Sequence, residues 1–456
     1  MKHKILTLIT TLTLTLTPTA QAIPYPDMTN ANQYPIPAGT QPQPTIPMTK
    51  AGECKRMGIV PNTNPETTPP AQLAWNMNKL HEFATGKGIK VAVIDSGINP
   101  NIRLPQLTGG GDYVTGGDGL EDCDSHGTLV AGIIGAQEAQ NDEFVGVAPD
   151  VEIISIRQTS AAYVPEKPED QGKQTSSLAT LANAIVRAVN LGANVINMSV
   201  TSCYPADVNV DTRDLQAAIN YANSRGVVLV TAAGNADPDS CKPNPGPSAE
   251  IPTDTRGWET VETLSMPSYY TPGLISVGGV TPRGAVFEQT MTGPWIDVAA
   301  PASDIVSLDP AGGDRGTIIN GEVVDSDIVP VSGTSFASAY VAGLVALMLE
   351  VDPELTPGQV SDRLMNAARP SNTVSRGATG AGAVDPVAAL TSVSSAVGTG
   401  VSSLPVDDLD DDVRGVGFWA GVVFVLVLLT CVVVLGYIGL FELNRRTRKD
   451  VGVDMI

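Results

Sequence analysis

The stretch VAVIDSG, residues 91–97, decides the fold class of this chain. Its run of apolar residues predicts a strand that is buried on both faces, which is typical of a parallel sheet covered by helices. A carboxylate, Asp95, emerges where this strand ends. Because open α/β sheets place their sites at the carboxyl ends of their strands, Asp95 is a candidate functional residue.

The sequence around this stretch extends the same pattern from about Leu73 to Leu390. Short apolar runs predict further buried strands, and the segments between them place apolar residues at helical spacing. The predicted strands are residues 89–94, 151–156, 195–198 and 227–231, and the predicted helices are residues 177–191 and 215–225. This alternation predicts an α/β fold in which helices cover both faces of a parallel sheet.

Two more stretches place candidate catalytic residues where helices begin. HGTLVAG, residues 126–132, begins with His126, and its small residues let neighbouring backbone approach the imidazole. The other candidate base near neutral pH is His81, because the third histidine lies in an N-terminal segment that we expect to be removed. GTSFASAYVAG, residues 333–343, places Ser335 at a helix start, where free backbone N–H groups can bind an oxyanion.

Taken singly, each candidate has a simpler structural explanation. A strand-end Asp or a helix-start Ser is more often a helix cap, and a lone His is more often a hydrogen-bonded structural residue. Together, the motifs DSG, HGTLVAG and GTSFASAYVAG resemble the signatures of the subtilisin-like serine proteases, whose triad follows the order Asp, His, Ser. The resemblance implies that Ser335 is the nucleophile, His126 the base that takes its proton, and Asp95 the carboxylate that orients the imidazolium.

A fourth motif, AAGN at residues 232–235, agrees with this resemblance. It follows the predicted strand 227–231, and in this family the asparagine side chain donates a hydrogen bond to the oxyanion. The resemblance therefore implies that Asn235 and the backbone N–H of Ser335 form the oxyanion hole. The chain departs from the family at Thr201, where many relatives have a glycine that lines the substrate cleft. We expect this side chain to narrow the cleft and to restrict which residues fit before the scissile bond.

The composition excludes a nucleic-acid-binding protein and a disordered chain. Asp and Glu (48) outnumber Lys and Arg (27), which gives a formal net charge of −21. Phosphate binding needs a surplus of basic residues, whereas the one dense basic run lies at residues 445–449. A hydrophobic content of 42% is enough to build a core. No loop has the ligand spacing of an EF-hand, so we expect neither a metal nor a cofactor.

Both ends of the chain carry targeting signals. Lys2 and Lys4 precede an apolar run that ends in Ala-Gln-Ala, so residues 1–22 are predicted to be a signal peptide. Residues 416–441 carry no charge, and about 26 residues at 1.5 Å each exceed a ~30 Å hydrocarbon core. This segment is predicted to be a single transmembrane helix.

The charges on the two sides of residues 416–441 predict how the chain is oriented. Acidic residues precede the segment at 407–412, and the basic run 445–449 follows it. The positive-inside rule then places residues 442–456 in the cytoplasm as a short tail. The protein is therefore expected in the cell membrane, with its catalytic domain on the extracytoplasmic side.

The sequence between the two ends divides into three zones. Residues 23–72 form a proline-rich arm, with eleven prolines from 23 to 70, so we expect it to be extended rather than folded as a separate domain. It is predicted to wrap the catalytic domain, stay attached and leave the cleft open. Residues 73–390 are the predicted catalytic domain, and residues 391–415 are predicted to be a flexible acidic linker.

This layout resembles a narrower group, the mycosins, which are membrane-anchored subtilisin-like proteases of type VII secretion systems. The resemblance rests on the signal peptide, the proline-rich arm, the catalytic domain, the C-terminal transmembrane helix and the placement of the cysteines. It implies that the partners are secreted protein substrates and the membrane complex of a type VII secretion system.

Two functional hypotheses follow from the resemblance. In the first, the protein is an active serine endopeptidase of narrow specificity. In the second, it mainly stabilises the secretion complex and its proteolysis is dispensable. An exported esterase of the α/β-hydrolase type is excluded, because that fold has its triad in the order Ser, Asp, His and has a G-x-S-x-G motif around the serine.

Five cysteines leave room for two disulfides in an oxidising compartment. Cys431 lies in the predicted transmembrane helix and should stay unpaired, and the other four allow three connectivities. The subtilisin-like family places the strand before Cys203 beside the strand before Cys241. The resemblance therefore implies the pairs Cys203–Cys241 and Cys54–Cys123.

Overall fold

The computed structural model of the chain describes residues 25–26, 28–39, 42–170, 177–248, 251, 253–370 and 376–392. Four predicted features lie outside these residues: the signal peptide (1–22), the transmembrane helix (416–441) with Cys431, the tail (442–456) and nearly all of the linker.

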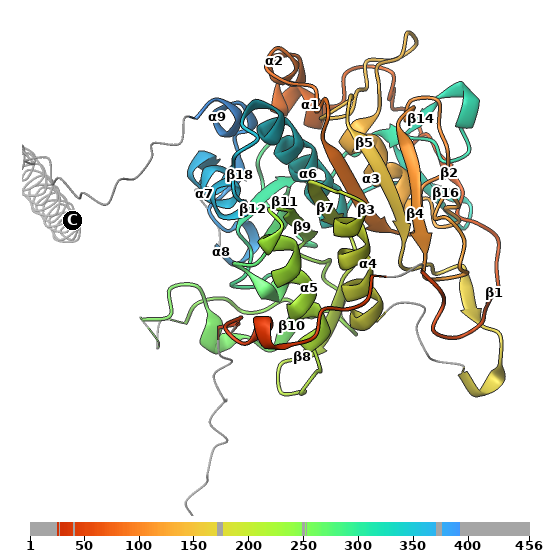
Figure 1. Ribbon diagram of the computed structural model, residues 1–456. Coiled ribbons are helices and arrows are strands. Elements are labelled where there is room, and N and C mark those ends of the chain that lie inside the picture. The colour runs from red at the N-terminus through yellow and green to blue at the C-terminus, as the bar shows by residue number, and fades with distance from the viewer. Residues whose placement is uncertain are drawn as a thin grey trace, which may run out of the picture. The chain divides into compact units, whose positions relative to one another are not determined.

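A nine-stranded sheet forms the centre of the domain (Figure 1). Its order is β17-β18-β12-β11-β9-β7-β3-β5-β4. The bounds of these strands are β3 (Lys90–Asp95), β4 (Leu107–Asp112), β5 (Glu152–Arg157), β7 (Val195–Met198), β9 (Val228–Ala232), β11 (Ile275–Val280), β12 (Val298–Pro301), β17 (Ala368–Arg369) and β18 (Ala383–Val384). All neighbours pair in parallel except β17 and β18, which are antiparallel. The predicted parallel sheet is confirmed, with an additional antiparallel edge.

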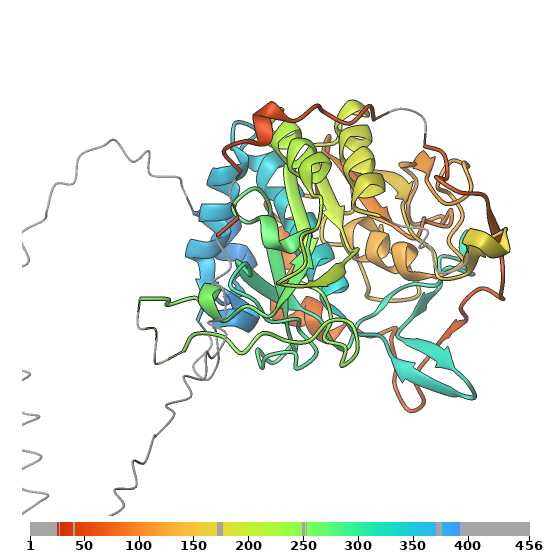
Figure 2. The same ribbon diagram turned by 90° about the horizontal axis from the view of Figure 1, so that it is seen from below.

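Helices cover both faces of this sheet (Figures 1 and 2). Their bounds are α1 (Pro70–Trp75), α2 (Met77–His81), α3 (His126–Gly135), α4 (Leu178–Asn190), α5 (Arg213–Ser224), α6 (Thr334–Val351), α7 (Pro357–Ala367), α8 (Arg376–Thr379) and α9 (Pro386–Thr391). Successive side chains of a strand point to opposite faces. Val91 and Val93 of β3 accordingly lie in one core with α3 and α6, whereas Ala92 and Ile94 lie in a second core with α4 and α5.

The longest of these helices, α6, runs through the first core. It is the only helix among the described residues that is long and apolar enough to cross a membrane, but 89% of its apolar window is buried inside the domain. It is therefore a core helix. Trp75 of α1 packs against it, with its ring 5.1 Å from that of Tyr340. Helix α1 spans the position, between residues 72 and 73, at which the sequence pattern places the start of the catalytic domain.

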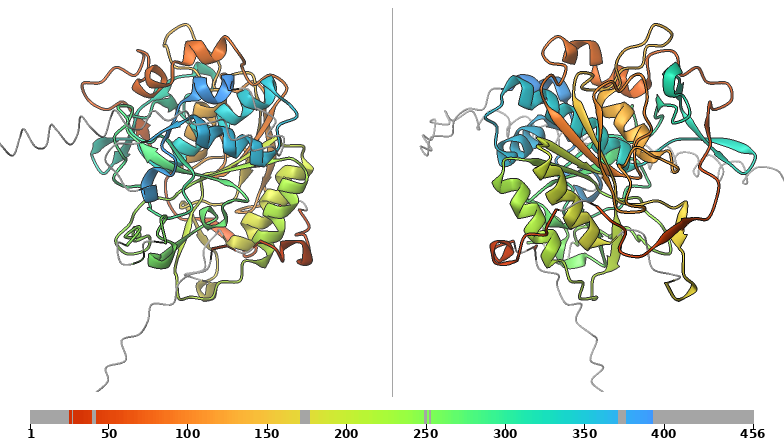
Figure 3. Two further views of the ribbon diagram at one scale, coloured as in Figure 1. Left: turned by 90° about the vertical axis from the view of Figure 1, so that its left-hand side faces the viewer. Right: turned by 45° about the vertical axis from the view of Figure 1, so that its right-hand side comes forward.

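The N-terminal arm runs over the surface of the domain (Figures 1 and 3). Before α1, its regular elements among the described residues are a turn of 3₁₀-helix, η1 (Ala31–Gln33), and two short strands, β1 (Met48–Lys50) and β2 (Met57–Gly58). Strand β1 pairs with β6 (Tyr163–Pro165). The arm thus gains its backbone hydrogen bonds from the domain rather than from a core of its own.

Strand β2 of the arm adds an edge to a hairpin of the domain. The hairpin consists of β15 (Gly321–Val324) and β16 (Asp327–Pro330), and it projects beside the arm (Figure 2). Met57 pairs with Glu322 and Gly58 with Gly321, so the three strands form one small sheet. The remaining strands form two-stranded pairs: β8 (Ser202–Pro205) with β10 (Thr263–Met266), and β13 (Ser307–Leu308) with β14 (Ile318–Ile319).

Candidate active site

Asp95 and His126 meet where a strand ends and a helix begins. Asp95 is the last residue of β3 and His126 the first of α3, and His126 Nδ1 lies 2.7 Å from Asp95 Oδ1. The same carboxylate oxygen accepts the backbone N–H of Ser96 at 2.7 Å. Asp95 is buried, whereas the His126 side chain stays 35% exposed. The imidazole is thus anchored at one nitrogen and open to solvent on another side.

The charge of Asp95 favours the protonated imidazole. Burial lowers the pKa of His126, but the charge of Asp95, the hydrogen bond with it and the charge of Asp122 together outweigh burial, so the pKa of His126 is raised. A raised pKa makes the imidazole a better proton acceptor.

Ser335 is the second residue of α6 and lies in the first turn of that helix. The residue before the helix, Gly333, has a φ of 151°, which a side chain would strain. A Cβ atom at Gly333 would also lie 3.3 Å from Nδ2 of Asn235. Glycine at this position therefore lets Asn235 come close to the start of α6.

Thr334 holds the side chain of Asn235 in place. Asn235 Oδ1 accepts the backbone N–H of Thr334 at 3.0 Å and its hydroxyl at 3.2 Å. The Thr334 hydroxyl oxygen in turn accepts the backbone N–H of Gly234 at 3.2 Å. With Oδ1 occupied in this way, the Nδ2 group of Asn235 remains as a donor for the cleft. The sequence pattern does not single out Thr334, although it lies within the quoted GTSFASAYVAG motif.

One cavity of about 340 Å³ brings three of the four candidate residues together. It is lined by Lys55, Met57, Asp124, Ser125, His126, Leu129, Asn235, Glu322, Pro330, Val331, Ser332, Ser335 and Phe336. Asp95 lies behind His126 rather than on the cavity wall. The arrangement places a hydroxyl, an imidazole and an amide donor around one space.

The arm forms part of this cavity, which the sequence pattern does not indicate. Lys55 Nζ lies 2.8 Å from Glu322 Oε1, so the arm and the β15–β16 hairpin are joined by an ion pair at the cavity wall. The backbone N–H of Lys55 also donates to the carbonyl of Cys123 at 2.8 Å. The only sequence signal for this contact is the neighbouring Cys54, whose pairing with Cys123 is implied by the family resemblance.

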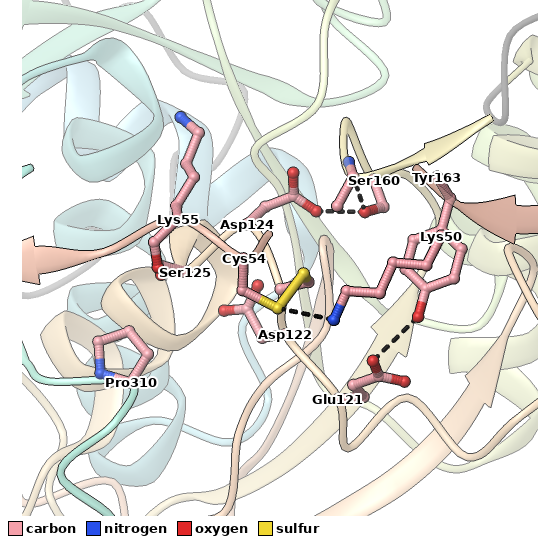
Figure 4. The surroundings of a disulfide bond; sticks show 12 residues. Lys50, Cys54, Lys55, Glu121, Asp122, Asp124, Ser125, Ser160, Tyr163 and Pro310 are labelled. Carbon is pink, nitrogen blue, oxygen red and sulfur yellow. Dashed lines mark hydrogen bonds between the residues drawn. A yellow bond between two sulfur atoms is a disulfide. The ribbon is translucent and has the colours of Figure 1, made fainter. Parts of the chain in front are cut away.

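The two disulfides have the connectivity that the resemblance implies. Cys54 is bonded to Cys123 and Cys203 to Cys241. Figure 4 shows the first of these bonds with Asp122, Asp124 and Ser125 around it. The bond attaches the arm to the loop that carries His126.

The other candidate base, His81, lies elsewhere. It ends α2, its ring nitrogen lies 3.1 Å from the carbonyl oxygen of Val147, and it does not line the cavity. Within the described part of the chain, no group of three or more His, Cys, Asp or Glu side chains is arranged to hold a metal ion.

Comparisons with known proteins identify the family. Residues 86–399 match the model of the Subtilase family. Mycosin-1 of Mycolicibacterium smegmatis is 41% identical over 355 residues, which are 76% of this chain and 78% of that protein. The chain belongs to the mycosins, a group within the subtilase family. It is therefore a subtilisin-like serine endopeptidase.

Solved structures agree with this assignment. One is described as the serine protease MycP1, an essential component of the type VII (ESX-1) secretion system; it has a TM-score of 0.75 and 41% identity, over 81% of this chain and 100% of that chain. A chain in an intact ESX-5 inner membrane complex has a TM-score of 0.76 and 35% identity, over 91% of this mycosin and 99% of that chain.

In this mycosin, Thr201 lies beside the loop that carries Asn235. A Cβ atom at Gly234 would lie 2.9 Å from Thr201 Cγ2, so the two segments are in close contact. Thr201 also lines a second cavity of about 220 Å³, together with Ser199 and Val200. The Ser199 hydroxyl donates to the carbonyl of Ser335 at 3.1 Å, which connects this second cavity to the start of α6.

Proposed function

We propose that this mycosin is a membrane-anchored, extracytoplasmic serine endopeptidase of narrow specificity that works with a type VII secretion complex. Its catalytic triad is Asp95, His126 and Ser335, and Asn235 donates to the oxyanion. The observation that carries the proposal is the 2.7 Å contact between His126 and Asp95 beside a cavity that His126, Asn235 and Ser335 line together.

The proposed reaction begins when Ser335 Oγ attacks the carbonyl carbon of the scissile peptide bond. His126 accepts the serine proton, and Asp95 holds the imidazole in its orientation and stabilises its positive charge. The negative charge that develops on the carbonyl oxygen is met by Asn235 Nδ2 and the backbone N–H of Ser335. His126 then gives the proton to the leaving amine, and water releases the acyl group from Ser335 by the same steps.

An active-site probe tests the triad without knowledge of the substrate. A fluorophosphonate reacts with an activated serine: the serine oxygen bonds to phosphorus, fluoride leaves, and the serine proton passes to the base. Full-length wild-type protein should be labelled at Ser335, and Ser335→Ala should not be labelled. In the related subtilisin triad, loss of the nucleophile lowers kcat on the order of a millionfold. Equal labelling of wild type and Ser335→Ala would contradict the proposal.

The narrow specificity is proposed from the walls of the cleft. Thr201, where the family resemblance implies a glycine, lies against Gly234 and lines the second cavity rather than the one that His126 and Ser335 line. Lys55 and Glu322 form an ion pair on the wall of the catalytic cavity, so a charged residue of the substrate meets fixed charges of both signs there. We infer that this pair selects among substrate residues that lie along the wall.

Charge exchange at the ion pair tests that inference. Lys55→Glu places an acidic side chain beside Glu322 in place of its basic partner and should lower the cleavage of sites with acidic residues there by about fivefold, as expected for partly exposed charges. The double variant Lys55→Glu, Glu322→Lys should restore the wild-type preference in a peptide-library digest. Lys79→Glu is the matched control, because Lys79 lies on α2 and its ion pair with Glu82, the residue after that helix, is outside the cavity. An unchanged preference in Lys55→Glu would exclude the ion pair as a selector.

The cellular setting is proposed from the relatives and from the ends of the chain. The related chains come from type VII secretion assemblies. We place residues 1–22 as the signal peptide, 23–72 as the arm, 73–390 as the catalytic domain, 391–415 as the linker, 416–441 as the membrane anchor and 442–456 as the cytoplasmic tail. Ser335→Ala in cells distinguishes the two hypotheses. If the variant loses substrate processing while secretion stays intact, proteolysis is dispensable for secretion and the stabilising role is favoured.

A further inference from the structure

A second carboxylate, Asp122, lies behind the Asp95–His126 pair. It is 4% exposed, and both of its oxygens accept hydrogen bonds. Oδ1 accepts the hydroxyl of Ser96 at 2.8 Å. Oδ2 accepts the backbone N–H of Thr128 at 2.8 Å and its hydroxyl at 2.6 Å. Asp122 precedes Cys123, so it belongs to the loop to which the disulfide attaches the arm (Figure 4).

These partners connect Asp122 to both members of the pair. Ser96 follows Asp95, and its backbone N–H donates to Asp95 Oδ1 at 2.7 Å. The Ser96 hydroxyl oxygen also accepts, at 2.9 Å, the backbone N–H of Gly127, which follows His126. A single chain of hydrogen bonds therefore joins Asp122, the end of β3 and the start of α3.

The same contacts replace the usual cap of α3. Ser125, at the N-cap position, has a φ of 66° and makes no side-chain cap bond. The free N–H groups of the first turn, those of Gly127 and Thr128, are instead satisfied by Ser96 and Asp122. A negative charge at this end of a helix is also favoured by the helix dipole. The orientation of the turn that carries His126 thus depends on side chains from outside the helix.

We propose that Asp122 is a positioning residue that aligns His126 with Asp95 through Ser96 and Thr128. This inference rests on the proposed function of the triad. Asp122 does not line the cavity, so it acts through other residues rather than on the substrate.

The charge of Asp122 gives this role a signature that a purely structural residue lacks. Three charged groups act on His126: Asp95 from β3, Asp122 from the loop before α3, and Lys55 from the arm. The two carboxylates raise the pKa of His126 and Lys55 lowers it. Burial raises the pKa of Asp122 itself to about 6, so its charge is present at neutral pH.

Asp122→Asn tests the proposal in the full-length protein, with fluorophosphonate labelling as the readout. Asn keeps the shape but has only one acceptor oxygen, so it cannot accept the bonds from Thr128 and the bond from the Ser96 hydroxyl together, and the turn that carries His126 should shift. Labelling should slow by about 10- to 100-fold, because small misplacements of catalytic groups have effects of this size. The acidic limb of the pH profile of the labelling rate should move to lower pH, because removal of the Asp122 charge lowers the pKa of His126.

Asp297→Asn is the matched control. Asp297 is 5% exposed, burial raises its pKa to about 6 as well, and it accepts bonds from a backbone N–H and a threonine hydroxyl. It precedes β12 at the amino end of the strand, opposite the edge that carries the site. Its labelling rate and pH profile should equal those of wild type.

Ser96→Ala separates geometry from charge and serves if Asp122→Asn does not fold. It breaks the hydrogen-bond chain but keeps the Asp122 carboxylate, so labelling should slow while the acidic limb stays in place. A wild-type rate in either folded variant would overturn the proposal, as would equal slowing by Asp297→Asn. Failure of the triad assignment itself would look different, because wild type and Ser335→Ala would then label alike.

Discussion

At the scale of single residues, Thr334 and Asn235 determine how an oxyanion could be bound. Both hydrogen bonds from Thr334 end on Asn235 Oδ1, which leaves Nδ2 for the cleft. Asn235→Ala should lower kcat by roughly 10²- to 10³-fold, because the backbone N–H of Ser335 remains as a second donor. Steady-state hydrolysis of a cleaved peptide measures this loss. Thr334→Val should have a smaller effect, since the hydrogen bond from the Thr334 backbone N–H to Asn235 Oδ1 survives. If Asn235→Ala lost as much activity as Ser335→Ala, Asn235 would be structural rather than an oxyanion donor.

Asp297 carries a prediction about stability and pH. Burial raises its pKa from 3.8 to about 6, so the folded state binds this proton more tightly than the unfolded state. The protonated Asp297 side chain therefore stabilises the folded state, and this stabilisation is fully present below the pKa that Asp297 has in the unfolded chain. It amounts to up to about 3 kcal/mol and is lost as the pH rises to about 6. Asp297→Asn should therefore reduce the fall in unfolding free energy between pH 4 and pH 7. Part of the fall should remain, because Asp122 titrates with the same sign. An unchanged pH dependence would contradict the raised pKa.

At the scale of elements, α1 belongs to the core of the catalytic domain. Trp75 is 4% exposed and packs on Tyr340 of α6, whereas Leu73 of the same helix is 65% exposed. Trp75→Ala should lower the unfolding free energy by about 3–5 kcal/mol, because it leaves a cavity beside α6. Leu73→Ala should change it by less than about 0.5 kcal/mol. Chemical denaturation of both variants measures the difference, and equal effects would show that α1 is only loosely attached.

At the scale of the whole molecule, we expect the arm to contribute stability rather than inhibition. Its disulfide to Cys123 closes a loop with a sequence separation of 69, which is worth about 4 kcal/mol in the chain-entropy model. Strands β1 and β2 add backbone pairing with the domain. Deleting residues 23–69 should lower the melting temperature by roughly 10 °C.

The same deletion should not unmask activity. Lys55 and Met57 border the cavity as part of its wall, and their removal takes away a surface on which substrate can lie. Fluorophosphonate labelling and peptide hydrolysis of the deleted protein measure this outcome. A many-fold rise in hydrolysis would identify the arm as an inhibitory propeptide.

The sheet and the helices of the site could be read from the sequence, because their signals are local. The run before Asp95 is apolar on both faces, and the predicted strand 195–198 coincides with β7. Helices begin at His126 and at Thr334, next to the residues singled out by motif. The antiparallel edge of β17 and β18 carried no such signal, since each strand is only two residues long.

The sequence by itself determined which residues could carry the chemistry, since each motif holds its reactive residue and its local backbone within a few positions. Only the tertiary structure decided which side chains surround them. Lys55 and Glu322 meet at the cavity wall, and Asp122 completes the first turn of α3 together with Ser96. Such contacts depend on which segments lie side by side once the sheet and the arm are in place. No local pattern of composition or spacing encodes that proximity, because nothing in the neighbouring sequence distinguishes these residues from other polar residues.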